Sequence, residues 1–250
     1  MLKLLKKVTS RAPQPGIPAG QRVYAIGDIH GRRDLLDQLL ELIQADDAAR
    51  GPAQQQLIFL GDLVDRGIDS AAVVERAIEI AGALPETRFL MGNHEEVFLL
   101  ALAGDLRALK MFCRIGGRET ILSYGLSEDA YNALDYEELL ERLPALVPAA
   151  HRAFLERFED LVVIGDYAFV HAGIRPGVPL AEQKVADLRW IREPFLDHRQ
   201  LHERVIVHGH SISEAAELTP ARIGIDTGAY MSGVLTALGL EGSARWLVNT

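Results

Sequence analysis

The chain has 250 residues, of which 48% are hydrophobic, and a formal net charge of −9. This length suits one large α/β domain or two small ones, and the apolar content excludes disorder as the default state. The acidic balance argues against nucleic-acid binding, which normally requires a basic excess.

The first 20 residues differ in character from the rest of the chain. Lys3, Lys6 and Lys7 lie among leucines, and a stretch rich in proline and glycine follows at 13–20. No apolar core or cleavage-like site follows the lysines, so the segment does not match a signal peptide. We predict a flexible basic tail and linker over 1–20, with contact to a membrane surface as the alternative. No later apolar run reaches the ~20 residues of a membrane span.

Short apolar runs of strand length recur along the chain, and polar residues follow them. The runs begin near residues 22, 56, 88, 167, 204 and 222. They are apolar at nearly every position, which is typical of strands buried on both faces. Apolar residues at helical spacing over 34–45 and 70–82 predict helices between the first three strands, and this alternation predicts parallel pairing. "GVLTALGL" and "ARWLV" predict an antiparallel hairpin around Glu241-Gly242.

From Glu95 to Asp160 the pattern is mostly helical. Gly116-Gly117 interrupts the helical runs, and Pro148 suits the first turn of the last one. No shift in composition marks this block as independent. We therefore expect one domain over 21–250, with a helical insert at about 97–160.

Acidic residues, histidines, an amide and an arginine follow five of the predicted strands. They are Asp28 and His30, then Asp62, Asp65 and Arg66, then Asn93 and His94, then His171, and then His208 and His210. Ligands of open α/β sheets bind beyond the carboxyl ends of the strands, so these side chains are expected to meet. Asp28 and His30 are two residues apart, and in an extended segment their side chains point the same way. Oxygen and imidazole donors without a thiolate favour two divalent ions over a structural zinc site.

These strings, in this order, resemble the phosphoprotein phosphatase branch of the calcineurin-like metallophosphoesterases. The signature there is GDxHG, GDxxDRG and GNHE followed by two histidines, and this chain has "GDIHG", "GDLVDRG", "GNHE", "HAG" and "HGHS". "RW" at 189–190 and "IDTGA" from 225 are similar to the compact bacterial and bacteriophage members. The resemblance spans about 22–238 and implies a two-sheet αββα sandwich with mixed parallel and antiparallel strands.

The resemblance also implies a set of metal ligands. For the first ion these are Asp28, His30 and Asp62, and for the second they are Asp62, Asn93, His171 and His210. A hydroxide that bridges the two ions would attack phosphorus directly. Mn²⁺ is the expected ion in vitro, and iron and zinc also fit the donor set.

Four further residues receive catalytic roles from the resemblance. His94 would protonate the leaving group, with Asp65 behind it to orient the ring. Arg66 and Arg192 would bind phosphate oxygens. Alternatives stay open here: His94 as a further metal ligand, His208 in place of His210, and Arg192 as a surface ion pair. The remaining histidines, such as His151, are expected at the surface.

The expected function is that of a metal-dependent phosphomonoesterase, a serine/threonine phosphatase acting on phosphoproteins or small phosphoesters. The alternative is a dinucleoside polyphosphate hydrolase of the diadenosine tetraphosphatase type, which shares the metal residues. In that relative the second acid of GDxxDRG is typically absent and the later block reads GNHD, so Asp65 and Glu95 favour the phosphatase. A catalytically dead scaffold protein should lack ligands, and the motifs argue against a cyclic-nucleotide phosphodiesterase.

The single cysteine, Cys113, fits a reducing compartment, so we expect a cytoplasmic protein of undetermined oligomeric state.

Overall fold

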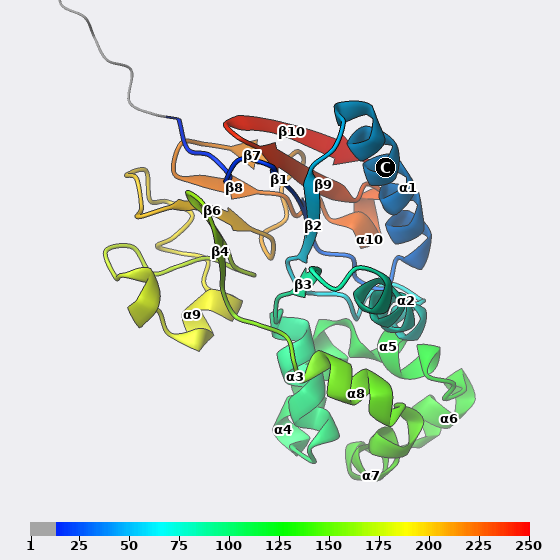
Figure 1. The fold of residues 1–250 in the computed structure, drawn as a ribbon. Coiled ribbons are helices and arrows are strands. Elements are labelled where there is room, and N and C mark those ends of the chain that lie inside the picture. The colour runs from blue at the N-terminus through cyan, green and yellow to red at the C-terminus, as the bar shows by residue number, and fades with distance from the viewer. Residues whose placement is uncertain (1–13) are drawn as a thin grey trace, which may run out of the picture.

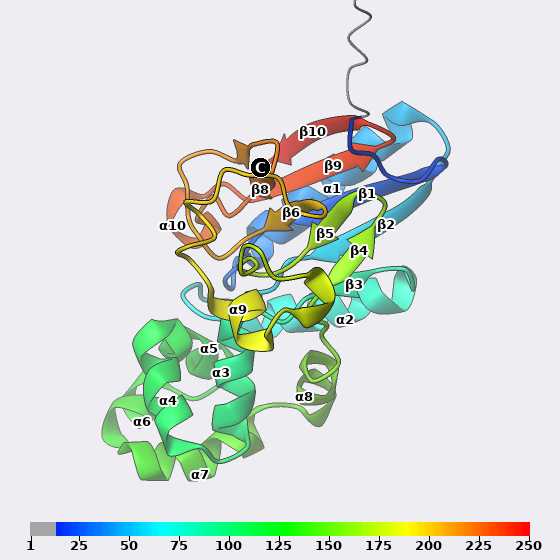
Figure 2. The same ribbon diagram turned by 90° about the vertical axis from the view of Figure 1, so that its left-hand side faces the viewer.

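A computed structural model describes residues 14–250 of the chain, and residues 1–13, with the lysines of the expected basic tail, lie outside the described part. Two β-sheets pack face to face, helices lie on both outer sides, and a helical block extends from one end (Figures 1 and 2). The predicted α/β sandwich with mixed parallel and antiparallel strands is confirmed.

The first sheet joins strands from both ends of the described chain. Its spatial order is β10 (Ala244–Asn249), β9 (Thr236–Glu241), β1 (Gln21–Ile26), β2 (Gln54–Phe59) and β3 (Arg88–Phe89). Strands β1, β2 and β3 pair in parallel, with Tyr24 opposite Leu57. Strand β9 pairs antiparallel with both β1 and β10, which is the predicted hairpin.

The second sheet is built from the later part of the chain. Its spatial order is β4 (Val162–Ile164), β5 (Tyr167–Phe169), β6 (Val205–His208), β8 (Arg222–Gly224) and β7 (Glu217–Leu218). Strands β5, β6 and β8 are parallel neighbours, whereas β4 and β7 pair antiparallel at the edges. The carboxyl ends of the three parallel strands therefore share one edge of this sheet.

Alternation along β1 explains why both of its faces are apolar. Val23 and Ala25 belong to the core between the two sheets, which includes Val207 of β6. Tyr24 and Ile26 point the other way, into the core under the helices. Successive side chains of a strand point to opposite faces, so a strand covered on both sides must be apolar throughout.

Helices cover the outer face of each sheet. α1 (Arg33–Arg50) and α2 (Ser70–Ala83) cover the first sheet. α9 (Val185–Trp190) lies over the second sheet after a 3₁₀ turn (Leu180–Glu182), and the short α10 (Ala229–Ser232) precedes β9. Within the described residues, every helix is too short or too polar to cross a membrane.

The block between β3 and β4 is helical. Its elements are α3 (Asn93–Leu102), α4 (Leu106–Phe112), a π-helical turn (Cys113–Gly117), α5 (Arg118–Ser123), α6 (Glu128–Ala133), α7 (Tyr136–Leu146) and α8 (Ala149–Leu155). Its core includes a stack of Phe98 on Phe112, with ring centroids 4.9 Å apart. The division into one domain over 21–250 with an insert over about 97–160 stays a prediction.

His151 corrects one expectation about this block. It is buried rather than exposed, because it joins α8 to the neighbouring helices. Its Nε2 lies 2.7 Å from Glu75 of α2, and its Nδ1 lies 3.0 Å from the Tyr124 hydroxyl. The sequence around His151 gave no sign of this position, because its partners are distant in the chain.

The segment before β1 is attached to both sheets where the structure describes it. Ile17 is buried in the core between the sheets, and its N–H donates to the carbonyl of Gly242 at 2.8 Å. The N–H of Gly16 donates to Asp166 at 2.9 Å. Residues 16–17, within the expected linker, are therefore part of the packed fold.

Candidate metal centre

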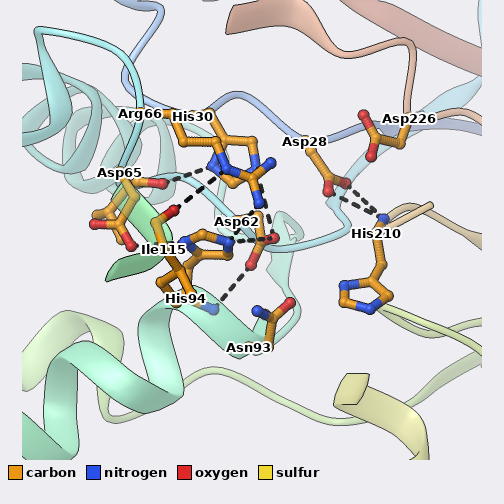
Figure 3. Close-up of polar contacts among 12 residues, drawn as sticks. Asp28, His30, Asp62, Asp65, Arg66, Asn93, His94, Ile115, His210 and Asp226 are labelled. Atoms are coloured by element: carbon orange, nitrogen blue, oxygen red, sulfur yellow. Dashed lines mark hydrogen bonds and ion pairs between the residues drawn. The ribbon is translucent and has the colours of Figure 1, made fainter. Parts of the chain in front are cut away.

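Residues that follow strands of both sheets lie close together, and Figure 3 shows Asp28, Asp62 and His210 among them. In the first sheet, β1 leads to Asp28 and His30, and β2 leads to Asp62. In the second sheet, β5 leads to His171 and β6 leads to His210. Asn93 and His94 form the first turn of α3, directly after β3. The predicted strand-end residues thus meet at the seam between the two sheets.

Left-handed backbone conformations concentrate at this site. Among residues 14–250, the non-glycine residues with positive φ are His30 (46°), Asp62 (53°), Asp65 (75°), Arg66 (68°) and His210 (63°). Each such residue costs ~1–3 kcal/mol and persists only where the surroundings impose it. The fold therefore holds these side chains in place against a local conformational cost.

Glu95 fixes the loop that carries Asp62. Its buried carboxylate accepts the N–H groups of Asp62 at 2.8 Å, Leu63 at 2.7 Å and Gly92 at 3.1 Å. Burial and the neighbouring Asp62 carboxylate raise the pKa of Glu95 to about 7. Gly92 must be glycine, because a Cβ there would lie 2.1 Å from Asp62 Oδ1. This glycine and carboxylate lock the Asp62 loop against the start of α3.

We expect Glu95→Gln to weaken both stability and metal binding. The amide would set an NH₂ group against backbone donors and remove a charge-assisted acceptor, at a cost of ~1.5–3 kcal/mol in the free energy of unfolding. Metal affinity should fall ~10–100-fold, as for other residues that support ligands. Denaturant titration and calorimetric Mn²⁺ titration measure the two effects. Glu41→Gln, an exposed position on α1, should change neither, and wild-type metal affinity in Glu95→Gln would contradict this role.

The ring orientations of His30 and His171 suit metal binding. His30 Nδ1 lies 2.8 Å from the Val64 carbonyl and His171 Nδ1 lies 2.7 Å from the Leu60 carbonyl. Both carbonyls are acceptors, so Nδ1 carries the hydrogen and Nε2 presents its lone pair to the site. The two Nε2 atoms lie 3.6 Å and 3.4 Å from Asp62 Oδ2.

Two groups of donor atoms share Asp62. His30, Asp62 and His94 offer atoms within 4.8 Å of one another, and so do Asp62, His171 and His210. Asn93 Oδ1 lies 3.0 Å from His171 Nε2, at the edge of the second group. Two imidazole and carboxylate clusters that meet at one carboxylate fit two neighbouring divalent ions.

Asp28 lies beside these groups rather than within them. Its carboxylate accepts the backbone N–H of His210 at 3.0 Å and 3.2 Å, which links the ends of β1 and β6. The pKa of Asp28 lies well above its usual range because the group is buried and faces the charges of Asp226 and Asp62. His94, expected mainly as an acid, occupies the first group where Asp28 was expected.

His94 is held by a chain of contacts that includes the helical block. Its Nδ1 lies 2.6 Å from the buried Asp65 carboxylate, and Thr120 of α5 donates its hydroxyl to the same carboxylate at 2.6 Å. Burial opposes the charged ring, but the pKa of His94 is raised overall by Asp62 and Asp65. The Arg66 guanidinium lies 3.0 Å from Nε2 of His94 and 2.9 Å from Nε2 of His30.

The two histidines of "HGHS" have different surroundings. His208 is buried, its Nδ1 lies 3.0 Å from the Gly209 carbonyl, and its Nε2 lies 3.3 Å from the Arg222 guanidinium. His210 faces His171, with ring centroids 5.1 Å apart. Arg192 is exposed beside them and donates to the His210 carbonyl at 3.2 Å. Only His210 of the pair belongs to a candidate metal group in the described residues.

Sequence reasoning missed three residues at this centre. Glu95 was used only to choose between families, although it supports the Asp62 loop. Thr120 gave no signal, because its partner Asp65 is distant in the sequence. Asp226 follows β8 in "RIGIDTG", so the strand-end rule applied to that run would have found it.

Comparison with known proteins agrees with this geometry at the level of the family. A sequence profile of the calcineurin-like phosphoesterases matches residues 21–233. A symmetrical bis(5'-nucleosyl)-tetraphosphatase from Methylococcus capsulatus is 35% identical over 154 residues, which cover 62% of this chain and 44% of that protein. The enzyme of the same name from Acidovorax sp. is 33% identical over 154 residues, with the same coverage. The chain therefore spans less than half the length of these curated relatives.

A solved structure gives the same fold over nearly the whole chain. It is described with diadenosine tetraphosphatase as its proposed activity, and it matches with a TM-score of 0.64 at 20% identity. The match covers 95% of this chain and 98% of that one.

The expected serine/threonine phosphatase function is wrong, because the curated relatives are named tetraphosphatases. The two residues that favoured the phosphatase contact other groups of the centre. Glu95 accepts backbone N–H groups and the Asp65 carboxylate lies 2.6 Å from His94 Nδ1, so their presence does not distinguish the two classes of enzyme. The two clusters that meet at Asp62 and the profile match over 21–233 lead to one assignment: the chain belongs to the calcineurin-like phosphoesterase family.

Proposed function

We propose that this chain hydrolyses bis(5'-nucleosyl) tetraphosphates symmetrically, giving two nucleoside diphosphates. The observation that carries the proposal is the 35% identity, over 154 residues, to a protein named for this activity. A centre able to hold two divalent ions supports it, because polyphosphate oxygens are hard ligands for such ions. The proposal concerns the class of substrate and leaves the choice of nucleobase open.

The proposed ligands are Asp28, His30 and Asp62 for the first ion, and Asp62, Asn93, His171 and His210 for the second. Two divalent ions in these positions would polarise phosphoryl oxygens and make a bound water acidic enough to attack near neutral pH. Asp62 is proposed to serve both ions because it belongs to both donor groups. His30 and His171 are oriented for this role by backbone carbonyls.

The other residues of the centre are proposed to act on the phosphates. His94 would protonate the leaving oxygen, and Asp65 would hold the ring in position. Arg66 reaches both His30 and His94, so a phosphate bound there would lie within reach of its planar guanidinium. Arg192, at the exposed side of His210, would bind a further phosphate oxygen.

We also propose that the single domain over 21–250 uses its helical insert to brace the centre. Thr120 of α5 binds Asp65, and the Gly116 carbonyl accepts the N–H of Arg66 at 3.0 Å. Both contacts reach the "GDLVDRG" loop from the insert. On this view the insert orients the acid and the arginine, and the sandwich supplies the ligands.

Rates on two substrates with Mn²⁺ test the proposal. We expect a kcat/KM for diadenosine tetraphosphate well above that for a phosphothreonine peptide, and ADP as the only nucleotide product. Reaction in ¹⁸O-water should place one label in one of the two ADP molecules, because a single water attacks one of the two central phosphorus atoms. Release of AMP and ATP, or a preference for the peptide, would overturn it. Chelator should abolish the activity and added Mn²⁺ should restore it.

A further inference from the structure

Asp226 carries a buried oxygen atom without a partner. The residue is 1% exposed, and Oδ1 accepts the N–H of Gly228 at 2.9 Å. Oδ2 is buried and makes no hydrogen bond to any described residue. A buried carboxylate oxygen left in this state is costly, and native structures normally supply a donor or a cation.

The chain brings Asp226 against Asp28. The Ile225 carbonyl would lie 2.5 Å from a Cβ on Gly27, so the two segments touch backbone to backbone. Figure 3 shows the Asp226 carboxylate beside that of Asp28, next to the start of the His210 loop. Burial raises the pKa of Asp28, and the carboxylates of Asp226 and Asp62 raise it further. Two buried carboxylates that repel each other thus face the same end of the centre.

We infer that Asp226 is a further carboxylate of the first metal position, where it acts with Asp28 on the ion or on a water coordinated to it. Hard divalent cations take carboxylate oxygens and commonly retain waters that bridge to further carboxylates. The unpartnered Oδ2 provides the acceptor, and a cation relieves the repulsion between the two acids. Asp226 follows β8, so the first position also draws a residue from the second sheet. The inference rests on the proposed metal roles and is independent of the substrate.

Asp226→Asn tests this inference by metal binding and by stability. The amide oxygen still accepts from Gly228, so the main change is the loss of charge. With metal removed by chelator, we expect Tm to rise by about 2–4 °C, because a buried like charge next to Asp28 is gone. With Mn²⁺, we expect one of two ions to bind ~10–100-fold more weakly in calorimetric titration, with the other unchanged. The rise in Tm that Mn²⁺ produces should shrink accordingly.

Three variants separate this role from damage to the loop. Thr227→Val removes a neighbouring hydroxyl, which donates to the Val234 carbonyl at 2.8 Å, without changing charge. It should lower Tm while both ions bind with wild-type affinity. Asp28→Asn should lower the affinity for the same ion. In the double variant Asp28→Asn, Asp226→Asn, the fold-loss of affinity should be smaller than the product of the losses in the two single variants.

Three outcomes would overturn the inference. Wild-type affinity for both ions in Asp226→Asn, whatever its metal-free Tm, would make Asp226 a structural residue of the loop. If Thr227→Val lowers the affinity for Mn²⁺ as much as Asp226→Asn does, the effect comes from the packing of the loop. A wild-type chain that binds no Mn²⁺ would overturn the proposed metal roles as well. A chain that binds Mn²⁺ but does not hydrolyse diadenosine tetraphosphate would overturn only the proposed substrate.

Discussion

Asp62→Asn is expected to lower kcat/KM by at least ~10⁴-fold, equivalent to ~5.4 kcal/mol of transition-state stabilisation, because Asp62 belongs to both donor groups and is proposed to bind both ions. His30 of one donor group and His171 of the other both lie close to Asp62 Oδ2. The amide would therefore lower the metal affinity of both groups. Metal analysis after dialysis should show fewer than one ion per chain, against two in the wild type. Turnover and metal content should fall in parallel.

The structure offers a matched control for this change. Asp105 caps α4 by accepting the N–H groups of Arg107 and Ala108, far from the centre. Asparagine is a good cap, so Asp105→Asn should leave stability, metal content and turnover near wild type. Retention of two ions in Asp62→Asn would contradict the shared-carboxylate role. Retained activity without ions would contradict the metal-dependent reaction as a whole.

His94→Asn is expected to lower kcat by ~10²–10⁴-fold while two ions remain bound. Its imidazole is held by Asp65 at 2.6 Å, and asparagine has no group that can donate a proton in its place. The size of the loss should depend on the leaving group. A nucleoside diphosphate leaves as a phosphate of pKa ~6 and needs little protonation, whereas an alkyl phosphoester leaves as a strongly basic alkoxide. The loss should therefore be smaller on diadenosine tetraphosphate than on an alkyl phosphate.

The same variant decides between the two roles of His94. Its ring belongs to a donor group with His30 and Asp62, which is the geometry of a ligand. If His94→Asn loses an ion, His94 is a ligand rather than the acid. A loss that is equal for both leaving groups would also contradict the acid role. Asp65→Asn serves as the comparison, because it should weaken the orientation of His94 and leave the ion count at two.

The strand ends and their convergence could be predicted from the sequence because they depend on local patterns. Apolar runs such as β1, buried on both faces, end where Asp28 and His30 begin, and the parallel order of β1, β2 and β3 brings their carboxyl ends together. The hairpin of β9 and β10 was predicted for the same reason, since Glu241-Gly242 interrupts two apolar runs. Local periodicity thus predicted the parallel strands and the hairpin of the first sheet, whereas the division into two sheets followed from the family resemblance.

Contacts between distant segments could not be predicted in the same way. Thr120 reaches Asp65, and His151 reaches Glu75, across the boundary between the insert and the sandwich. No pattern in one sequence encodes such pairs. The substrate was predicted wrongly for a related reason. The prediction used Asp65 and Glu95, and these residues contact other parts of the centre, so their identity says little about the substrate.

The five left-handed residues of the centre have a consequence for selection. Glycine would relieve the conformational cost at His30, Asp62 or His210, but it carries no side chain that could serve the reaction. Stability and activity therefore favour different residues at the same positions. A library of variants selected only for resistance to heat should accumulate glycine or asparagine there and lose catalysis. On the proposed roles, histidine and aspartate at these positions serve the reaction at a local cost in stability.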